Sequence, residues 1–151
     1  MQPHIQLLRP LNSLMAALAV FTGALVAVGT GLLGSPNLNG LGVAMLVAFI
    51  YTGAGNALND YYDRFTDRVN HPERPIPRKK IRPAAVWRYS VVLFGVGALL
   101  ALFIGWPRIN YLCLAVAFIN GILLAAYEMR LKRLGFVGNL TVSWLTTIRA
   151  A

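Results

Sequence analysis

Three of the five acidic residues in this chain, Asp60, Asp63 and Asp67, lie within eight positions of one another. In a continuous helix Asn59, Asp63 and Asp67 recur every four residues and share one face, which Asp60 borders. Carboxylates one turn apart repel each other, so a cation between them is expected. Mg²⁺ takes oxygen ligands, usually one or two carboxylates with water and substrate phosphates. The spacing indicates a site for a Mg²⁺-bound diphosphate; the alternative is a solvated helix end that marks a membrane boundary.

The elements that must position these residues are membrane helices. The 151 residues are 57% hydrophobic and 13% charged, with a mean hydropathy of +0.59, whereas a soluble domain carries about a quarter charged residues. Four apolar runs are long enough to cross a bilayer, and they occupy residues 11–33, 38–58, 84–104 and 110–129. A fifth run, 136–148, reaches only about 20 Å of the roughly 30 Å hydrocarbon core. We expect an all-α polytopic membrane bundle of four full transmembrane helices plus the start of a fifth, one domain over 1–151 that is truncated at its C-terminus.

Positive charge is concentrated between the apolar runs, and the formal net charge is +9. Arg9, the loop 63–83 and the loop 130–133 fall on one side of the predicted membrane, and Arg108 alone falls on the other. This asymmetry predicts a multi-pass protein of the cell membrane with a cytoplasmic N-terminus and cytoplasmic basic loops. No nucleic-acid motif occurs, so anionic lipid or phosphate is the expected partner. The single cysteine, Cys113, excludes a disulfide within the chain.

Several spaced motifs resemble one family. The stretch NDYYDRFTD at 59–67, followed by RPIP at 74–77, resembles the first aspartate-rich motif of the UbiA superfamily of intramembrane prenyltransferases. RPLNSLMA at 9–16 resembles the family's entry to the first helix. Tyr127 with LKR at 131–133 resembles its second loop, and Gly138 with Asn139 resembles the start of its fifth helix.

Within the superfamily, RPLNSLMA together with TGAGNALNDYYDRFTDRVN (52–70) is most similar to the archaeal digeranylgeranylglyceryl phosphate synthases. The resemblance implies transfer of a geranylgeranyl group from its diphosphate to geranylgeranylglyceryl phosphate, within archaeal ether-lipid biosynthesis. The family fold has nine membrane helices and a second aspartate-rich motif after the sixth, which this chain lacks. Activity is therefore expected once the remaining helices are supplied, for example by a complementary C-terminal half or by an oligomer.

The resemblance also implies the ligands of a first Mg²⁺. Asp63 and Asp67 are expected to hold the ion directly or through water, and Asn59 to add a neutral oxygen. Asp60 is expected to contact the ion or the substrate, or to orient neighbouring basic residues.

Basic and polar residues from other segments are expected to bind the diphosphate. Arg74 and Lys132 lie in the two loops that flank the site, and a role in membrane topology is the alternative for both. Arg9 and Asn12 are expected to reach the same cavity from the first helix, or else to serve packing or to anchor the helix at the membrane interface. Glu128 is expected to pair with Lys132 four residues later and has no assigned catalytic role.

Three local features carry further expectations. Gly53 and Gly55 just precede the acidic stripe and predict close helix contact or a bend. Arg64 and Arg68 are expected to pair with the stripe or with lipid headgroups. The stretch PRKK at 77–80 stands where the family usually has a small residue and Gly after the proline, so the loop is expected to depart from the family's shape there.

Other functions remain open from the sequence. One is a non-catalytic membrane fragment that binds anionic or isoprenoid lipid, and another is a UbiA-type enzyme with an aromatic acceptor from a quinone or porphyrin pathway. A CDP-alcohol phosphatidyltransferase is disfavoured because its motif carries Gly and Ala-Arg between the aspartates. This chain has Tyr61-Tyr62 and Phe65-Thr66 there instead.

Overall fold

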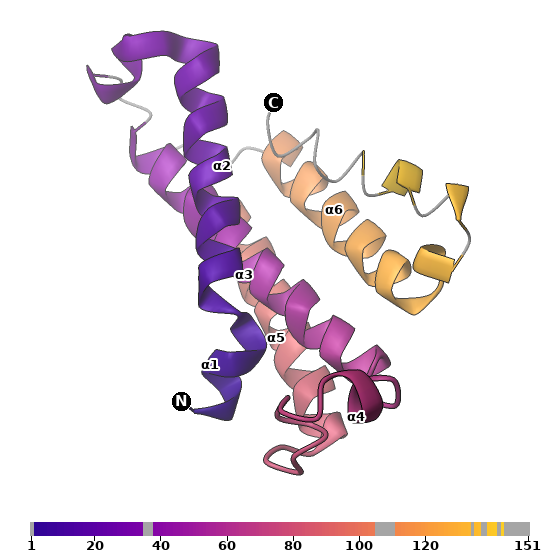
Figure 1. Ribbon diagram of the computed structural model, residues 1–151. Helices are drawn as coiled ribbons and strands as arrows, with labels where there is room; N and C mark the ends of the chain where they lie inside the picture. Colours follow the sequence, from indigo (N-terminus) through magenta and orange to yellow (C-terminus); the bar gives the residue numbers. More distant parts are fainter. Residues whose placement is uncertain are drawn as a thin grey trace.

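The computed structural model of the chain describes residues 2–34, 38–104, 111–133, 135–136, 139–141 and 143. Within these ranges the chain is helical and forms no strand. The elements, shown in Figure 1, are α1 (Pro3–Leu8), α2 (Pro10–Val28), the 3₁₀ helix η1 (Gly29–Gly34), α3 (Leu38–Tyr62), α4 (Asp67–Asn70), α5 (Pro83–Ala101), α6 (Tyr111–Met129) and the 3₁₀ helix η2 (Leu131–Arg133).

Helix α3 is the centre of the bundle. It packs against α1, α2, α5 and α6, and α6 runs to one side of the others (Figure 1). Helices α2, α3, α5 and α6 are each long and apolar enough to cross a membrane. The expected all-α bundle with four full membrane helices is therefore confirmed. Most of the expected fifth segment, 136–148, lies outside the described residues.

The helix boundaries differ from the expected spans at several points. The first membrane helix stops at Val28 instead of residue 33, because Gly29 adopts φ +70° and the chain continues as the 3₁₀ helix η1. The third stops at Ala101 instead of residue 104. Helix α1 was not expected; its Leu7 is fully buried in a cluster with Ala57 and Val86.

A left-handed residue turns α1 into α2. Arg9 has φ +46° and ψ +69°, a conformation that L-residues rarely adopt, and its N–H donates to the carbonyl of Gln6. Pro10 then begins α2 at the first helical position, which suits a residue without a backbone N–H. The carbonyl of Leu8 accepts hydrogen bonds from Ser13 Oγ at 2.8 Å and from Asn56 Nδ2 at 3.1 Å. These bonds hold the junction, and with it Arg9, against α3.

Small residues let the helices approach α3 closely. A Cβ on Gly53 would lie 2.4 Å from the Leu8 side chain, and one on Gly55 would lie 2.7 Å from Leu124 of α6. The close helix contact expected at these two glycines is confirmed. Ser90 of α5 donates its buried hydroxyl to the carbonyl of Ala54 at 2.8 Å, a polar contact that suits a membrane interior.

Replacing Gly97 by alanine is expected to lower the free energy of unfolding by about 1–3 kcal/mol, the usual cost of overpacking. A Cβ at Gly97 would lie 2.5 Å from the ring of Tyr51, which is buried and packed edge-on against Phe94. Gly95→Ala on the same helix is the matched control, because no atom lies within 4 Å of its Cβ. Thermal and denaturant unfolding in micelles measure both. Equal destabilisation of the two variants would contradict the packing described.

Candidate functional site

The acidic stripe spans the end of α3 and the start of α4. Helix α3 ends at Tyr62 and residues 63–66 form turns, so the stripe is not one regular helix. The helical backbone bonds nevertheless continue, from Asp63 N to Asn59 O and from Asp67 N to Asp63 O, both at 2.8 Å. The one-turn spacing predicted for these three residues is thus kept.

Asp60 and Asp67 belong to what we term the arginine cluster, made of Arg9, Asp60, Asp67 and Arg74. Arg9 Nη2 donates to Asp60 Oδ1 at 2.5 Å. Arg74 Nη1 donates to Asp67 Oδ2 at 2.6 Å and lies 3.3 Å from Asp60 Oδ1. Two carboxylates therefore meet two guanidiniums supplied by the α1–α2 junction and by the loop after α4.

The arginine cluster has buried carboxylates and is balanced in charge. The side chains of Asp60 and Asp67 are 4% and 5% exposed, whereas those of Arg9 and Arg74 are 35% and 22% exposed. Buried carboxylates require partners, and both have them here. The cluster joins the N-terminal segment, the end of α3, α4 and the following loop.

Asp63 belongs to a second group, the lysine cluster, made of Asn59, Asp63, Glu128 and Lys132. Lys132 Nζ donates to Asp63 Oδ1 at 2.6 Å and to Glu128 Oε2 at 3.1 Å. Asn59 Nδ2 donates to Asp63 Oδ2 at 2.9 Å and to Glu128 Oε2 at 2.8 Å. This group joins α3 to α6 and η2.

The lysine cluster contains a more exposed carboxylate than the arginine cluster and carries an excess of negative charge. The side chain of Asp63 is 31% exposed and that of Lys132 is 19% exposed. Two carboxylates here face one ammonium. Burial by itself would lower the pKa of Lys132, but its hydrogen bonds and charge interactions with Asp63 and Glu128 outweigh burial and raise the pKa. Lys132 is therefore a firmly protonated cation beside an exposed carboxylate.

The residues predicted from the sequence meet at one end of the bundle with one exception. The two clusters contain Arg9, Asn59, Asp60, Asp63, Asp67, Arg74 and Lys132. Asn12 has a different partner: it donates to Asn56 Oδ1 at 3.2 Å, a contact between α2 and α3. Asn59 donates hydrogen bonds to both carboxylates of its cluster. The sequence predicted a role for its amide oxygen as a metal ligand and did not predict this role as a donor.

Glu128 is the site residue that sequence reasoning passed over. Its pairing with Lys132 is confirmed, but it also accepts a hydrogen bond from Asn59 across the helix interface. It is the buried residue of α6, whose other side chains are more exposed. An acidic residue within an apolar span was the available signal, because such residues usually face the bundle interior and serve function.

Replacing Glu128 by leucine is expected to lower the free energy of unfolding by about 1–3 kcal/mol, the cost of leaving buried donors unpaired. The change removes one acceptor from Asn59 Nδ2 and from Lys132 Nζ, and it puts an apolar side chain of similar size in the place of the glutamate. Glu128→Gln retains an acceptor oxygen and is expected to cost less. Denaturant unfolding in micelles compares the two. A leucine variant as stable as the wild type would show that the bonds of Glu128 do not anchor α6.

Arg64 and Arg68 do not pair with the acidic stripe. The guanidinium of Arg64 lies 4.7 Å from the centre of the Tyr61 ring and 4.5 Å from that of Phe65, and it donates to the carbonyl of Tyr61. Arg68 lies 5.3 Å from the Phe65 ring. Of the two roles expected for these arginines, pairing with the acidic stripe is therefore wrong, because each guanidinium stacks on an aromatic ring instead.

The oxygen donors at this end of the bundle fit Mg²⁺ in type. Within the described residues no three His, Cys, Asp or Glu side chains form a group that could hold a metal ion. Mg²⁺, however, is usually held by one or two carboxylates together with substrate phosphates. Asp63 and Asp67, one turn apart, supply two carboxylates of this kind, and Asp63 is the more accessible.

Comparison with known proteins identifies the family. Residues 12–150 match the UbiA prenyltransferase family. The chain is 43% identical over 142 residues to a digeranylgeranylglyceryl phosphate synthase from Natronomonas pharaonis, covering 94% of this chain and 48% of that protein. It is 43% identical over 145 residues to a synthase of the same name from Methanothrix thermoacetophila, covering 94% and 50% respectively. The chain thus spans about half the length of these relatives.

A solved structure has the same fold. It comes from a study described as "Structural and mechanistic insights into the biosynthesis of Digeranylgeranylglyceryl phosphate synthase in membranes", and it matches with a TM-score of 0.83 at 28% sequence identity. The match covers 98% of this chain and 50% of the other. The helical arrangement and the family match agree over nearly the whole sequence. The chain belongs to the UbiA prenyltransferase family.

Proposed function

We propose that this chain forms the diphosphate-binding part of a Mg²⁺-dependent prenyltransferase that moves a geranylgeranyl group to geranylgeranylglyceryl phosphate, as in archaeal ether-lipid biosynthesis. The observation that carries the proposal is the lysine cluster, in which an accessible carboxylate and a protonated lysine lie together at the end of two membrane helices. Such a site suits a substrate with a charged diphosphate and a long apolar tail. The names of the relatives support this choice of reaction.

In the proposed site, Asp63 and Asp67 would hold Mg²⁺, and the Asn59 amide orients the carboxylate of Asp63. When bound, Mg²⁺ would neutralise the negative charge of the leaving diphosphate. Lys132 and Arg74, which reach the stripe from two different loops, donate to diphosphate oxygens. Asp60 positions Arg74 and Arg9 beside this site.

The proposed reaction exchanges one carbon–oxygen bond for another. The bond between C1 of the geranylgeranyl group and the diphosphate breaks, and its electron pair leaves with the diphosphate. A hydroxyl oxygen of the acceptor bonds to C1 and loses its proton. The chain's share in this step is to place cations around the leaving group at the edge of an apolar bundle.

We also propose that the site faces the cytoplasm. Arg9, the loop between α3 and α5, and the turn after α6 lie at the same end of the bundle as both clusters. These segments carry most of the positive charge of the chain, which favours their retention on the cytoplasmic side.

The proposal is tested with the chain reconstituted in phosphatidylcholine bilayers. Equilibrium binding of radiolabelled geranylgeranyl diphosphate to the chain is expected to require Mg²⁺ and to be competed by pyrophosphate. Transfer is then assayed on geranylgeranylglyceryl phosphate and on 4-hydroxybenzoate after a complementary C-terminal half has been supplied. Binding of geranylgeraniol as tight as that of the diphosphate would favour a lipid-binding fragment instead. Transfer to 4-hydroxybenzoate alone would assign an aromatic acceptor.

A further inference from the structure

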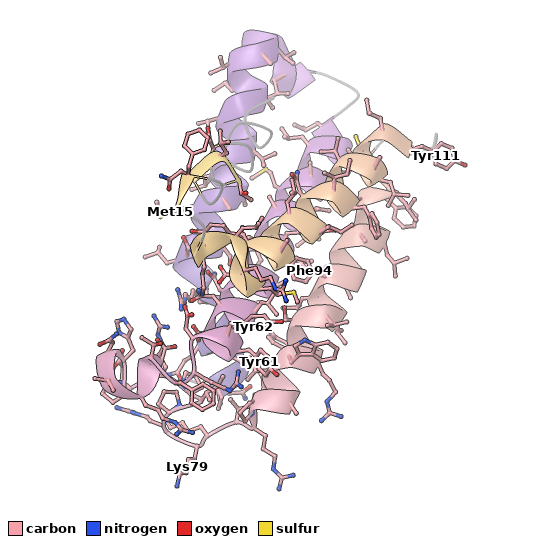
Figure 2. All side chains as sticks on the ribbon, turned by 90° about the vertical axis from the view of Figure 1, so that its right-hand side faces the viewer. Met15, Tyr61, Tyr62, Lys79, Phe94 and Tyr111 are labelled. Carbon is pink, nitrogen blue, oxygen red and sulfur yellow. The ribbon has the colours of Figure 1, made fainter. Side chains whose placement is uncertain are left out.

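Apart from Arg64, which stacks on Tyr61 and Phe65, the cations described at the site end of the bundle fall into two classes. Arg9, Arg74 and Lys132 are all paired with carboxylates, as described above. A second class is exposed, and no ion pair joins its members to any carboxylate of the described residues; it comprises Arg68, Arg78, Lys79, Lys80, Arg82, Arg88 and Arg130. Figure 2 shows nitrogen-bearing side chains pointing outward from the bundle around the labelled Lys79.

Three of the unpaired cations are consecutive and form what we term the basic tip, residues 78–80. On either side of it, Ile76 and Ile81 pack against the buried cluster that contains Val86 of α5. Backbone bonds close the tip, from Lys79 N to Ile76 O at 2.9 Å and from Lys80 N to Pro75 O at 3.0 Å. The tip is therefore a defined turn, and its backbone fixes the positions from which the three charged side chains extend.

The middle residue of the basic tip stands in an unfavourable backbone conformation. Lys79 has φ +57°, and Arg9 is the other non-glycine residue with positive φ among those described. A long side chain in this region is strained, and such strain is often found at functional positions. Glycine or asparagine would adopt the positive φ at position 79 more readily, so the geometry of the turn alone does not account for the lysine there.

The basic tip lies shortly before a helix that is long and apolar enough to cross a membrane. Ile81 precedes Pro83, the first residue of the membrane helix α5, by two positions, and it packs against the buried cluster that contains Val86. The exposed acidic residue of this loop, Glu73, is paired with His71. No ion pair therefore joins the three charges of the basic tip to a carboxylate of the described residues, beside the start of α5.

We propose that the basic tip binds the headgroups of anionic phospholipids in the same membrane. Charge complementarity supports this partner, because juxtamembrane lysine and arginine clusters are attracted to anionic leaflets. A turn that is folded in advance presents three charges without further ordering, which favours headgroup binding over a loose electrostatic contact. The proposal is independent of the reaction proposed above.

The test uses the full chain in zwitterionic detergent with an equimolar mixture of phosphatidylglycerol and phosphatidylcholine, read by native mass spectrometry. The wild type is expected to retain phosphatidylglycerol in preference. Lys79→Gly is expected to weaken this binding about fivefold, the usual effect of one juxtamembrane cation. The same variant is expected to melt at or above the wild-type temperature, because glycine relieves the positive φ. Weaker lipid binding by a variant that is as stable as the wild type, or more stable, would show that the loss comes from the missing charge and not from misfolding.

Two matched variants and one competitor complete the test. Lys79→Asn also tolerates positive φ and is expected to bind as weakly as the glycine variant, whereas Lys79→Arg keeps the charge and is expected to bind like the wild type. Equal retention of the two lipids by the wild type, or wild-type binding by both neutral variants, would overturn the proposal. Displacement of phosphatidylglycerol by equimolar inorganic phosphate would also overturn it, by showing a site for small anions.

Discussion

Replacing Asp63 by asparagine is expected to weaken Mg²⁺-dependent binding of geranylgeranyl diphosphate by about a hundredfold, while the free energy of unfolding changes by less than about 1 kcal/mol. The carboxylate of Asp63 is partly exposed and supplies both a proposed metal ligand and the charge that holds Lys132. Its ion pair is accessible to solvent, so that its loss costs little stability. Equilibrium binding in bilayers and unfolding in micelles give the two quantities.

The Asp63 prediction has a control within the same cluster. Glu128→Gln keeps an acceptor oxygen for Lys132 and Asn59 and leaves Asp63 in place, so diphosphate binding is expected to fall much less. A binding constant for the Asp63 variant within threefold of wild type at saturating Mg²⁺ would show that Asp63 does not bind the metal–diphosphate, and it would contradict the proposed role of the lysine cluster.

Replacing Asp60 by asparagine is expected to lower the free energy of unfolding by about 3 kcal/mol, in contrast to the small change in stability expected for Asp63→Asn. Asp60 is almost fully buried and lies against both Arg9 and Arg74. Breaking a buried ion pair by removing one partner costs about 3–5 kcal/mol, because the remaining charge is left uncompensated. The lower end applies here, since both guanidiniums have some access to water.

The two aspartate variants form a matched pair, because the same substitution is made three positions apart in one stripe. Denaturant unfolding of both in the same micelles tests whether the stripe is divided as the structure indicates. If Asp60→Asn and Asp63→Asn were equally stable, the arginine cluster would not be a buried connection between the segments that it joins. Arg9→Gln is expected to destabilise less than Asp60→Asn, because Arg9 is the most exposed member of that cluster.

The sequence alone determined the class of protein and named most of the residues that meet in the two clusters. Hydrophobic runs of membrane-spanning length and interrupting basic loops depend only on local composition, and a bilayer imposes helices on such runs. The four-residue spacing of Asn59, Asp63 and Asp67 is also a local property, and it survives in the backbone bonds even where α3 has ended.

Only the tertiary structure decided which residues act together. Asp60, Asp63 and Asp67 look alike in the sequence, yet two face the arginines and one faces Lys132, because their partners come from segments distant in the chain. Glu128 gained its place in the site by contact with Asn59 across the α3–α6 interface, which no spacing along one helix could specify. Helix α1 likewise depends on burial of Leu7 against α3 and α5, since a segment of six residues is too short to be helical by its own propensity.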